Sequence, residues 1–172
     1  MSEAKGPARP QQLVHPDWVW IGGRLEKGRV VGIDDRGRIA SIAPVSGPST
    51  LRLPGKALIP GFVSAHSHAF QRGLRGVTER FGSAAGGFFS WRDAMYGLVE
   101  RLTPDRCYEL SRETFSEMLT AGITSVGEFH YVRHHIPTAP GEPEREPERE
   151  EDRYAFDASV LAAARDAGIR IT

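Results

Sequence analysis

The stretch that decides the fold is IPGFVSAHSHAFQRG, residues 59–73, in which two histidines stand one residue apart after an apolar run. Residues 57–63 are almost all apolar, and such a run predicts a strand buried on both faces in a parallel sheet. Side chains two residues apart on a strand share a face, so His66 and His68 are expected to project together from its carboxyl end. Two such imidazoles can share a metal ion, or they can be two polar residues at the end of an ordinary strand.

The sequence after the histidines alternates between helical and strand patterns. Apolar spacing and turn signals predict helices over residues 90–101, 103–121 and 157–168, and strands over 123–132 and 169–172. Thr103 can cap the second helix, with proline at its first position, and Asp157 can cap the third. This βαβα order predicts an α/β fold with parallel strand pairing.

The sequence before the histidines has a different character. Residues 13–55 alternate between apolar and polar side chains and contain glycine turns, which predicts a small antiparallel β-unit. Much of one face of this unit is expected to consist of Trp18, Trp20, Val30, Ile33, Ile39 and Ile42. Residues 1–12 are polar and predict a disordered lead. Residues 137–153 contain Glu-Pro-Glu-Arg twice, and we interpret them as a mobile, solvated loop without an assigned function.

Composition narrows the class of protein. The chain has 172 residues, with 22 basic and 22 acidic side chains, so no overall charge favours nucleic acid or a membrane surface. The single cysteine, Cys107, cannot form a disulfide within the chain. No apolar run reaches the ~18 residues of a membrane span, and the polar start has no apolar leader segment. These features favour a soluble, cytoplasmic protein.

Three stretches resemble the amidohydrolase superfamily, and within it most closely the formimidoylglutamate deiminases of histidine degradation. They are HSHAFQRGLRG at 66–76, FFSWRDAMYGLVERLTP at 88–104 and EMLTAGITSVGEFHYVRHH at 117–135. One departure from the superfamily is Ser64, where an aspartate is common two residues before the first histidine. The resemblance implies the N-terminal part of a (β/α)8 TIM barrel over residues 56–172, preceded by a small β-sandwich segment over residues 13–55.

The resemblance also implies roles for individual residues. His66 and His68 match the first two ligands of a single Zn²⁺ or another divalent ion. Gln71, Arg92 and Tyr131 match substrate-binding residues, and a guanidinium suits a carboxylate because its planar fork binds both oxygens. Each has a plainer alternative: a loop-capping amide for Gln71, a salt bridge with Asp93 or Glu100 for Arg92, and a core aromatic for Tyr131. His130, His134 and His135 follow a different strand and are not expected to be ligands.

The activity implied is zinc-dependent hydrolysis of N-formimidoyl-L-glutamate to N-formyl-L-glutamate and ammonia. The partner is then a small dicarboxylate substrate, with no nucleic acid or membrane, and a homodimer is an option. No catalytic residue is expected in this chain, because the residues after Lys56 are too few for a barrel of ~200 or more residues. We therefore expect part of a longer enzyme. The alternatives are another aminohydrolase of the superfamily acting on a nucleobase, or a non-catalytic metal-binding fragment.

Overall fold

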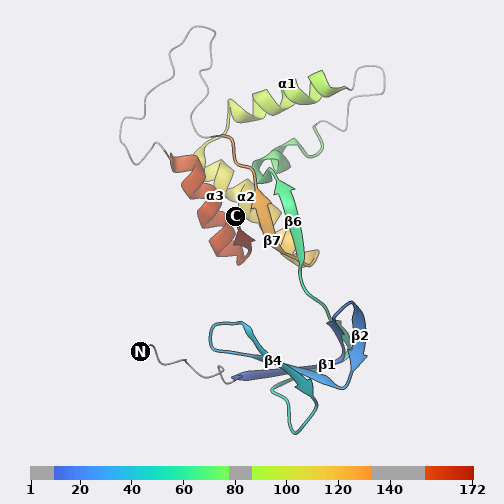
Figure 1. Ribbon diagram of the computed structural model, residues 1–172. Coiled ribbons are helices and arrows are strands. Elements are labelled where there is room, and N and C mark those ends of the chain that lie inside the picture. The colour runs from blue at the N-terminus through green and yellow to red at the C-terminus, as the bar shows by residue number, and fades with distance from the viewer. Residues whose placement is uncertain (1–9, 78–86, 133–153) are drawn as a thin grey trace, which may run out of the picture. The chain divides into compact units, whose positions relative to one another are not determined.

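The computed structural model describes residues 10–77, 87–132 and 154–172 (Figure 1). The chain divides into two compact units, residues 1–60 and residues 61–172. The expected loop at 137–153, together with His134 and His135, lies outside the described residues. No helix within the described ranges is both long and apolar enough to cross a membrane.

The first unit is a five-stranded sheet built around β1 (Gln12–Ile21), which starts inside the lead that was expected to be disordered. β1 pairs antiparallel with β2 (Arg24–Lys27) and with β3 (Arg29–Ile33), and β3 pairs antiparallel with β4 (Ile39–Pro44). β5 (Leu51–Leu58) instead runs parallel to β1. The prediction of an antiparallel unit is therefore wrong for this last strand.

The prediction that the tryptophans belong to the apolar face of this sheet is wrong. Val14, Pro16 and Val19 are the buried side chains of β1, whereas Trp18 and Trp20 are exposed. The alternation of inward and outward side chains in β1 changes where its register with β5 shifts, between Pro16 and Trp18, opposite two extra residues in β5. Among the other predicted members, Val30 is buried, Ile33 is half-buried, and Ile39 and Ile42 are exposed.

The expected strand over residues 57–63 is not continuous, because one strand ends and another begins within this range. β5 finishes at Leu58 in the first sheet, and β6 (Phe62–Ser67) begins the second. Pro60, which cannot donate a backbone hydrogen bond, lies in the break between them. Phe62 and Val63 are 59% and 70% exposed, so the prediction of a strand buried on both faces is also wrong for the described residues.

The second unit has three parallel strands in the order β6-β7-β8, with helices between them (Figure 1). β6 leads into a 3-10 helix, η1 (Ala69–Leu74), and then into α1 (Phe88–Val99) and α2 (Pro104–Thr120). β7 (Ile123–Glu128) is followed by α3 (Ala155–Ala167) and β8 (Arg170–Ile171). The α/β class and the parallel pairing predicted from the sequence are confirmed.

Helix ends follow local chemistry closely. The Thr103 hydroxyl accepts a hydrogen bond from the Arg106 amide at 3.2 Å, so the predicted cap of α2 is confirmed. Gly168 ends α3 with φ 85°, a left-handed conformation that glycine adopts without strain. The predicted cap at Asp157 is wrong: α3 begins two residues earlier, and Asp157 lies in its first turn.

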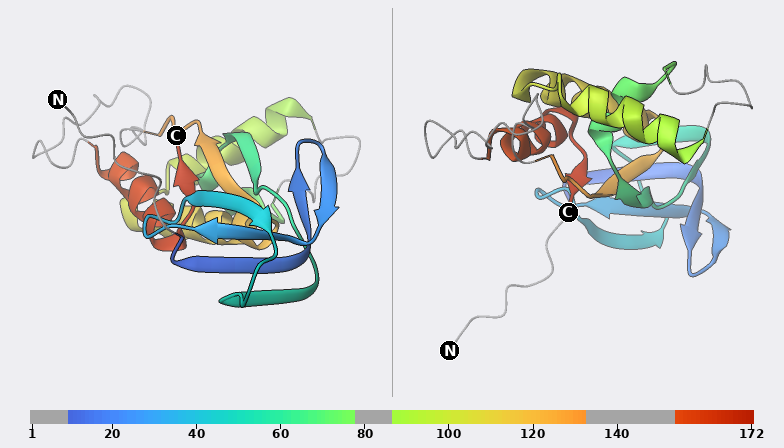
Figure 2. Two further views of the ribbon diagram at one scale, coloured as in Figure 1. Left: turned by 60° about the horizontal axis from the view of Figure 1, so that its bottom comes forward. Right: turned by 90° about the horizontal axis from the view of Figure 1, so that it is seen from above.

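The core of the second unit lies between the sheet and its helices. α2 and α3 pack against each other, and they contact β7 and β8 respectively (Figures 1 and 2). The most deeply buried side chains of this core include Phe70, Leu102, Cys107, Leu110, Phe115, Ala163 and Ala164. Phe70 belongs to η1, so this apolar layer holds the segment immediately after the two histidines.

Candidate functional site

His66 and His68 face each other at the carboxyl end of β6. Their Nε2 atoms are 2.9 Å apart, and the two rings meet edge to face at a centroid distance of 4.6 Å. Three steps along β6, from Ser64 to Ser67, match only two along β7, from Val126 to Glu128. This bulge inserts one residue into β6 next to His66, and bulges near active sites commonly redirect side chains. The predicted proximity of the two rings is confirmed.

A backbone carbonyl orients the ring of His68. Nδ1 of His68 donates a hydrogen bond of 2.8 Å to the carbonyl oxygen of Phe129, which can only accept. In a neutral imidazole this leaves a lone pair on Nε2, the atom that faces His66. Metal-binding histidines usually have their second nitrogen held in this way.

Gln71 and Tyr131 meet beside the histidines. The amide nitrogen of Gln71 donates to the Tyr131 hydroxyl at 2.7 Å, and the Tyr131 ring lies edge to face with His68 at 5.1 Å between centroids. Partial burial raises the pKa of Tyr131 above its ordinary value, although the hydrogen bond from Gln71 opposes the rise. The hydroxyl therefore stays protonated at neutral pH, and its own hydrogen is free to be donated.

Ion pairs hold η1 against α2 and so fix the segment that carries Gln71. The Arg72 guanidinium lies 2.7 Å from the Glu113 carboxylate and 2.6 Å from that of Glu117, which also pairs with Arg75 at 3.0 Å. Hydrogen bonds from Arg75 and Arg72 lower the pKa of Glu117. A network of this kind is more effective than a single exposed pair.

Arg92 makes no contact with the histidine pair, Gln71 or Tyr131 among the interactions that the structure describes. Its guanidinium is 3.8 Å from the Asp93 carboxylate and 5.0 Å from the centroid of the Phe89 ring, both within α1. The plainer alternative of a pair with Asp93 is therefore present, although its length makes it weak. The Arg92 Nε atom is buried and has no hydrogen-bond partner among the described residues. The structure thus brings together four of the five predicted site residues and not Arg92.

The two imidazoles fit part of a metal site. Nitrogen atoms 2.9 Å apart can both lie at about 2.0–2.1 Å from one ion, the distance at which imidazole binds Zn²⁺. Across the described ranges, no group of three histidine, cysteine, aspartate or glutamate side chains is placed to hold a metal. A catalytic zinc usually has three protein ligands, so this pair would need a further ligand.

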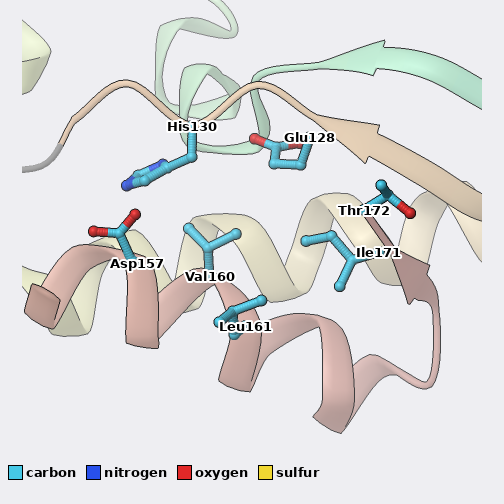
Figure 3. A pocket seen from close by; sticks show the side chains of 7 residues that line it. All are labelled: Glu128, His130, Asp157, Val160, Leu161, Ile171 and Thr172. Atoms are coloured by element: carbon cyan, nitrogen blue, oxygen red, sulfur yellow. The ribbon is translucent and has the colours of Figure 1, made fainter.

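Glu128 and His130 form a second polar group, and the sequence analysis predicted no role for either residue. Both line a pocket of about 180 Å³ between β7, β8 and α3, with Asp157 on its helical side (Figure 3). Glu128 Oε2, both ring nitrogens of His130 and Asp157 Oδ2 are buried without a partner in the described chain. Strand alternation was the available signal, because Glu128 and His130 are two residues apart.

Comparison with known proteins gives consistent matches. The sequence profile of the Amidohydrolase family matches residues 57–172. Formimidoylglutamate deiminase of Pseudomonas aeruginosa is 40% identical over 100 residues, which are 58% of this chain and 22% of that protein. 5'-Deoxyadenosine deaminase of Methanothermobacter thermautotrophicus is 27% identical over 132 residues, 74% of this chain and 29% of that protein. The chain therefore spans about a quarter of the length of these curated relatives.

A solved amidohydrolase structure is also similar to this chain. The crystal structure of an amidohydrolase from Brucella melitensis superimposes with a TM-score of 0.79 at 31% sequence identity. The match covers 94% of this chain and 34% of the other. The similarity thus extends over nearly all of the residues from both units.

Proposed function

Since the chain belongs to the amidohydrolase family, we propose that the whole protein, meaning these residues with whatever sequence adjoins them in the cell, is a deiminase. Its reaction would be hydrolysis of N-formimidoyl-L-glutamate to N-formyl-L-glutamate and ammonia. The observation that carries the proposal is the grouping of His66 and His68 with the bonded pair Gln71 and Tyr131, inside the segment that matches the amidohydrolase family. The similarity to the Pseudomonas deiminase over 100 residues supports the choice of substrate.

The architecture proposed for the whole protein is a (β/α)8 barrel. Parallel strands joined through helices, as in β6, β7 and β8, are the repeating unit of such barrels. Active sites of barrels form at the carboxyl ends of the strands, and the histidine pair lies at that end of β6. The remaining ligands and the general acid or base would come from other strands.

The described residues suit the proposed chemistry. A divalent cation such as Zn²⁺, held by His66 and His68, would supply Lewis acidity and activate water. Tyr131 accepts a hydrogen bond from Gln71 and so keeps its own hydroxyl hydrogen available for an acceptor atom of the substrate. Arg92 is proposed to bind a substrate carboxylate with both arms of its guanidinium.

A second candidate function comes from the similarity to 5'-deoxyadenosine deaminase. A nucleoside or nucleobase has no carboxylate, so Arg92 would then have no charged group of the substrate to bind. The two candidates therefore differ in what they require of one side chain on α1.

Ammonia release by the purified whole protein separates these candidates. We expect N-formimidoyl-L-glutamate to be hydrolysed with kcat/KM of about 10⁴ M⁻¹s⁻¹ or more, which is the lower end for enzymes acting on their own substrates. 5'-Deoxyadenosine and free nucleobases should react far more slowly. Faster turnover of a nucleoside than of the dicarboxylate would contradict the proposal.

A further inference from the structure

The residue that follows His68 is held on both sides of its peptide backbone. The amide of Ala69 donates to Oε1 of Glu128 at 2.7 Å, and its carbonyl accepts from the hydroxyl of Thr114 at 3.0 Å. Ala69 is 1% exposed, and the side chains of its partners Glu128 and Thr114 are half-buried. A hydrogen bond from an amide to a carboxylate at this distance belongs to the strong, charge-assisted class.

The Glu128 bond completes a set of contacts around His68. The Phe129 amide donates to the carbonyl of Ser67 at 2.9 Å, and the Phe129 carbonyl accepts from the His68 ring at 2.8 Å. Three hydrogen bonds therefore join the surroundings of His68 to Glu128 and Phe129, at the end of β7: one to the residue before His68, one to the residue after it and one to its ring. Glu128 provides the only one of these three bonds that depends on a side chain of that segment, so a substitution at Glu128 can remove its bond and leave His68 itself unchanged.

The carboxylate of Glu128 is directed to this backbone. Its Oε1 atom is engaged by Ala69, whereas Oε2 is buried without a partner in the described chain. Glu128 also lines the pocket that contains His130 and Asp157 (Figure 3). These three side chains do not form a metal-binding group in the described part of the structure. A carboxylate in this place can act on the site through the backbone that it holds.

We propose that Glu128 is a positioning residue for His68: it fixes the Ala69 amide and thereby the direction in which the imidazole projects. The inference rests on the proposed function only in taking His68 as a metal ligand. Residues that orient metal ligands typically change metal affinity 10- to 100-fold when they are replaced.

The test uses the whole protein with three substitutions. Glu128→Ala removes the acceptor, Glu128→Gln keeps a neutral oxygen that can still accept from Ala69, and Tyr108→Phe serves as the control. Tyr108 donates to Asp166 at 2.9 Å between α2 and α3, so its replacement removes a hydrogen bond of similar length elsewhere in the same unit. Two quantities are measured: the zinc dissociation constant by chelator competition, and hydrogen exchange at the Ala69 amide in metal-free protein.

We expect Glu128→Ala to weaken zinc binding about 10- to 100-fold and to accelerate exchange at Ala69. Glu128→Gln should restore most of both properties, and Tyr108→Phe should alter neither. Wild-type zinc affinity in Glu128→Ala would overturn the inference, as would equal losses in all three variants, which would indicate general destabilisation. A wild-type protein that binds no zinc would overturn it as well. Zinc binding that follows the expected pattern without turnover of the dicarboxylate would refute the proposed function and leave this inference standing.

Discussion

Gly127 lies opposite the bulge in β6, and replacing it with alanine should disturb the histidine pair. A Cβ atom at Gly127 would lie 2.8 Å from the backbone oxygen of Ala65 and 3.2 Å from its carbonyl carbon. Ordinary contacts of this kind begin at 3.4 Å, so the two strands must separate by about 0.6 Å or distort. The obstacle is backbone, so a change of side-chain rotamer cannot relieve it.

We expect Gly127→Ala to lower the free energy of unfolding of the whole protein by about 1–3 kcal/mol, the usual cost of overpacking. Ala65 directly precedes His66, so the displacement should also weaken zinc binding. Urea unfolding measures the first effect, as a lower midpoint at unchanged slope, and chelator competition measures the second.

Gly97→Ala is the matched control, because it makes the same substitution without a clash. Gly97 is inside α1, and a Cβ there would meet only the end of the Arg101 side chain, at 3.7 Å. Alanine is favoured over glycine inside a helix by roughly 0.5–1 kcal/mol, so this variant should be more stable than wild type with unchanged zinc affinity. A Gly127→Ala protein with wild-type stability and zinc affinity would refute the reasoning.

Three further predictions concern the site and the core. His66→Ala and His68→Ala should each abolish zinc retention and activity in the whole protein; metal analysis showing unchanged zinc would remove both from the ligand set. Arg92→Ala should lower kcat/KM for the dicarboxylate by about tenfold or more, since a charge-assisted hydrogen bond contributes roughly 1.5–3 kcal/mol. Arg92→Lys should have a kcat/KM between those of Arg92→Ala and wild type, and both variants should bind the normal amount of zinc. Burial raises the pKa of the Cys107 thiol from 9.0 to about 11, so the folded state binds the thiol proton more strongly than the unfolded state does. The stability that this difference contributes is complete below pH 9 and should be lost as the pH rises to 11. Urea midpoints measured across that range should fall more steeply for wild type than for Cys107→Ala.

Local signals in the sequence predicted the helices well. Thr103 and Gly168 bound α2 and α3 as expected, because capping depends on residues within one helical turn. Helix α1 begins two residues before the predicted start at Ser90. The two histidines meet as predicted, although β6 has a bulge beside His66 and His68 directly follows the strand.

Features that depend on strand register could not be predicted in the same way. The alternation of β1 changes beside the register shift between Pro16 and Trp18, where β5 contains two extra residues, and the alternation of apolar and polar residues in the sequence did not reveal it. The partners of the site are also distant in sequence: Glu128 holds Ala69 across 59 positions, and Gln71 meets Tyr131 across 60. Such pairs are decided by how β6 and β7 align, which a single sequence does not specify.

The bond between His68 and the Phe129 carbonyl spans 61 positions, and this separation has a consequence during translation. Ribosomes add about 5–20 residues per second, so Phe129 is made roughly 3–12 s after His68. Throughout that interval a nascent chain already contains both histidines, while the carbonyl group that orients the His68 ring does not yet exist. Metal ions encountered during those seconds would meet two freely rotating imidazoles, and the arrangement seen in the folded protein can arise only after the second strand has been synthesised.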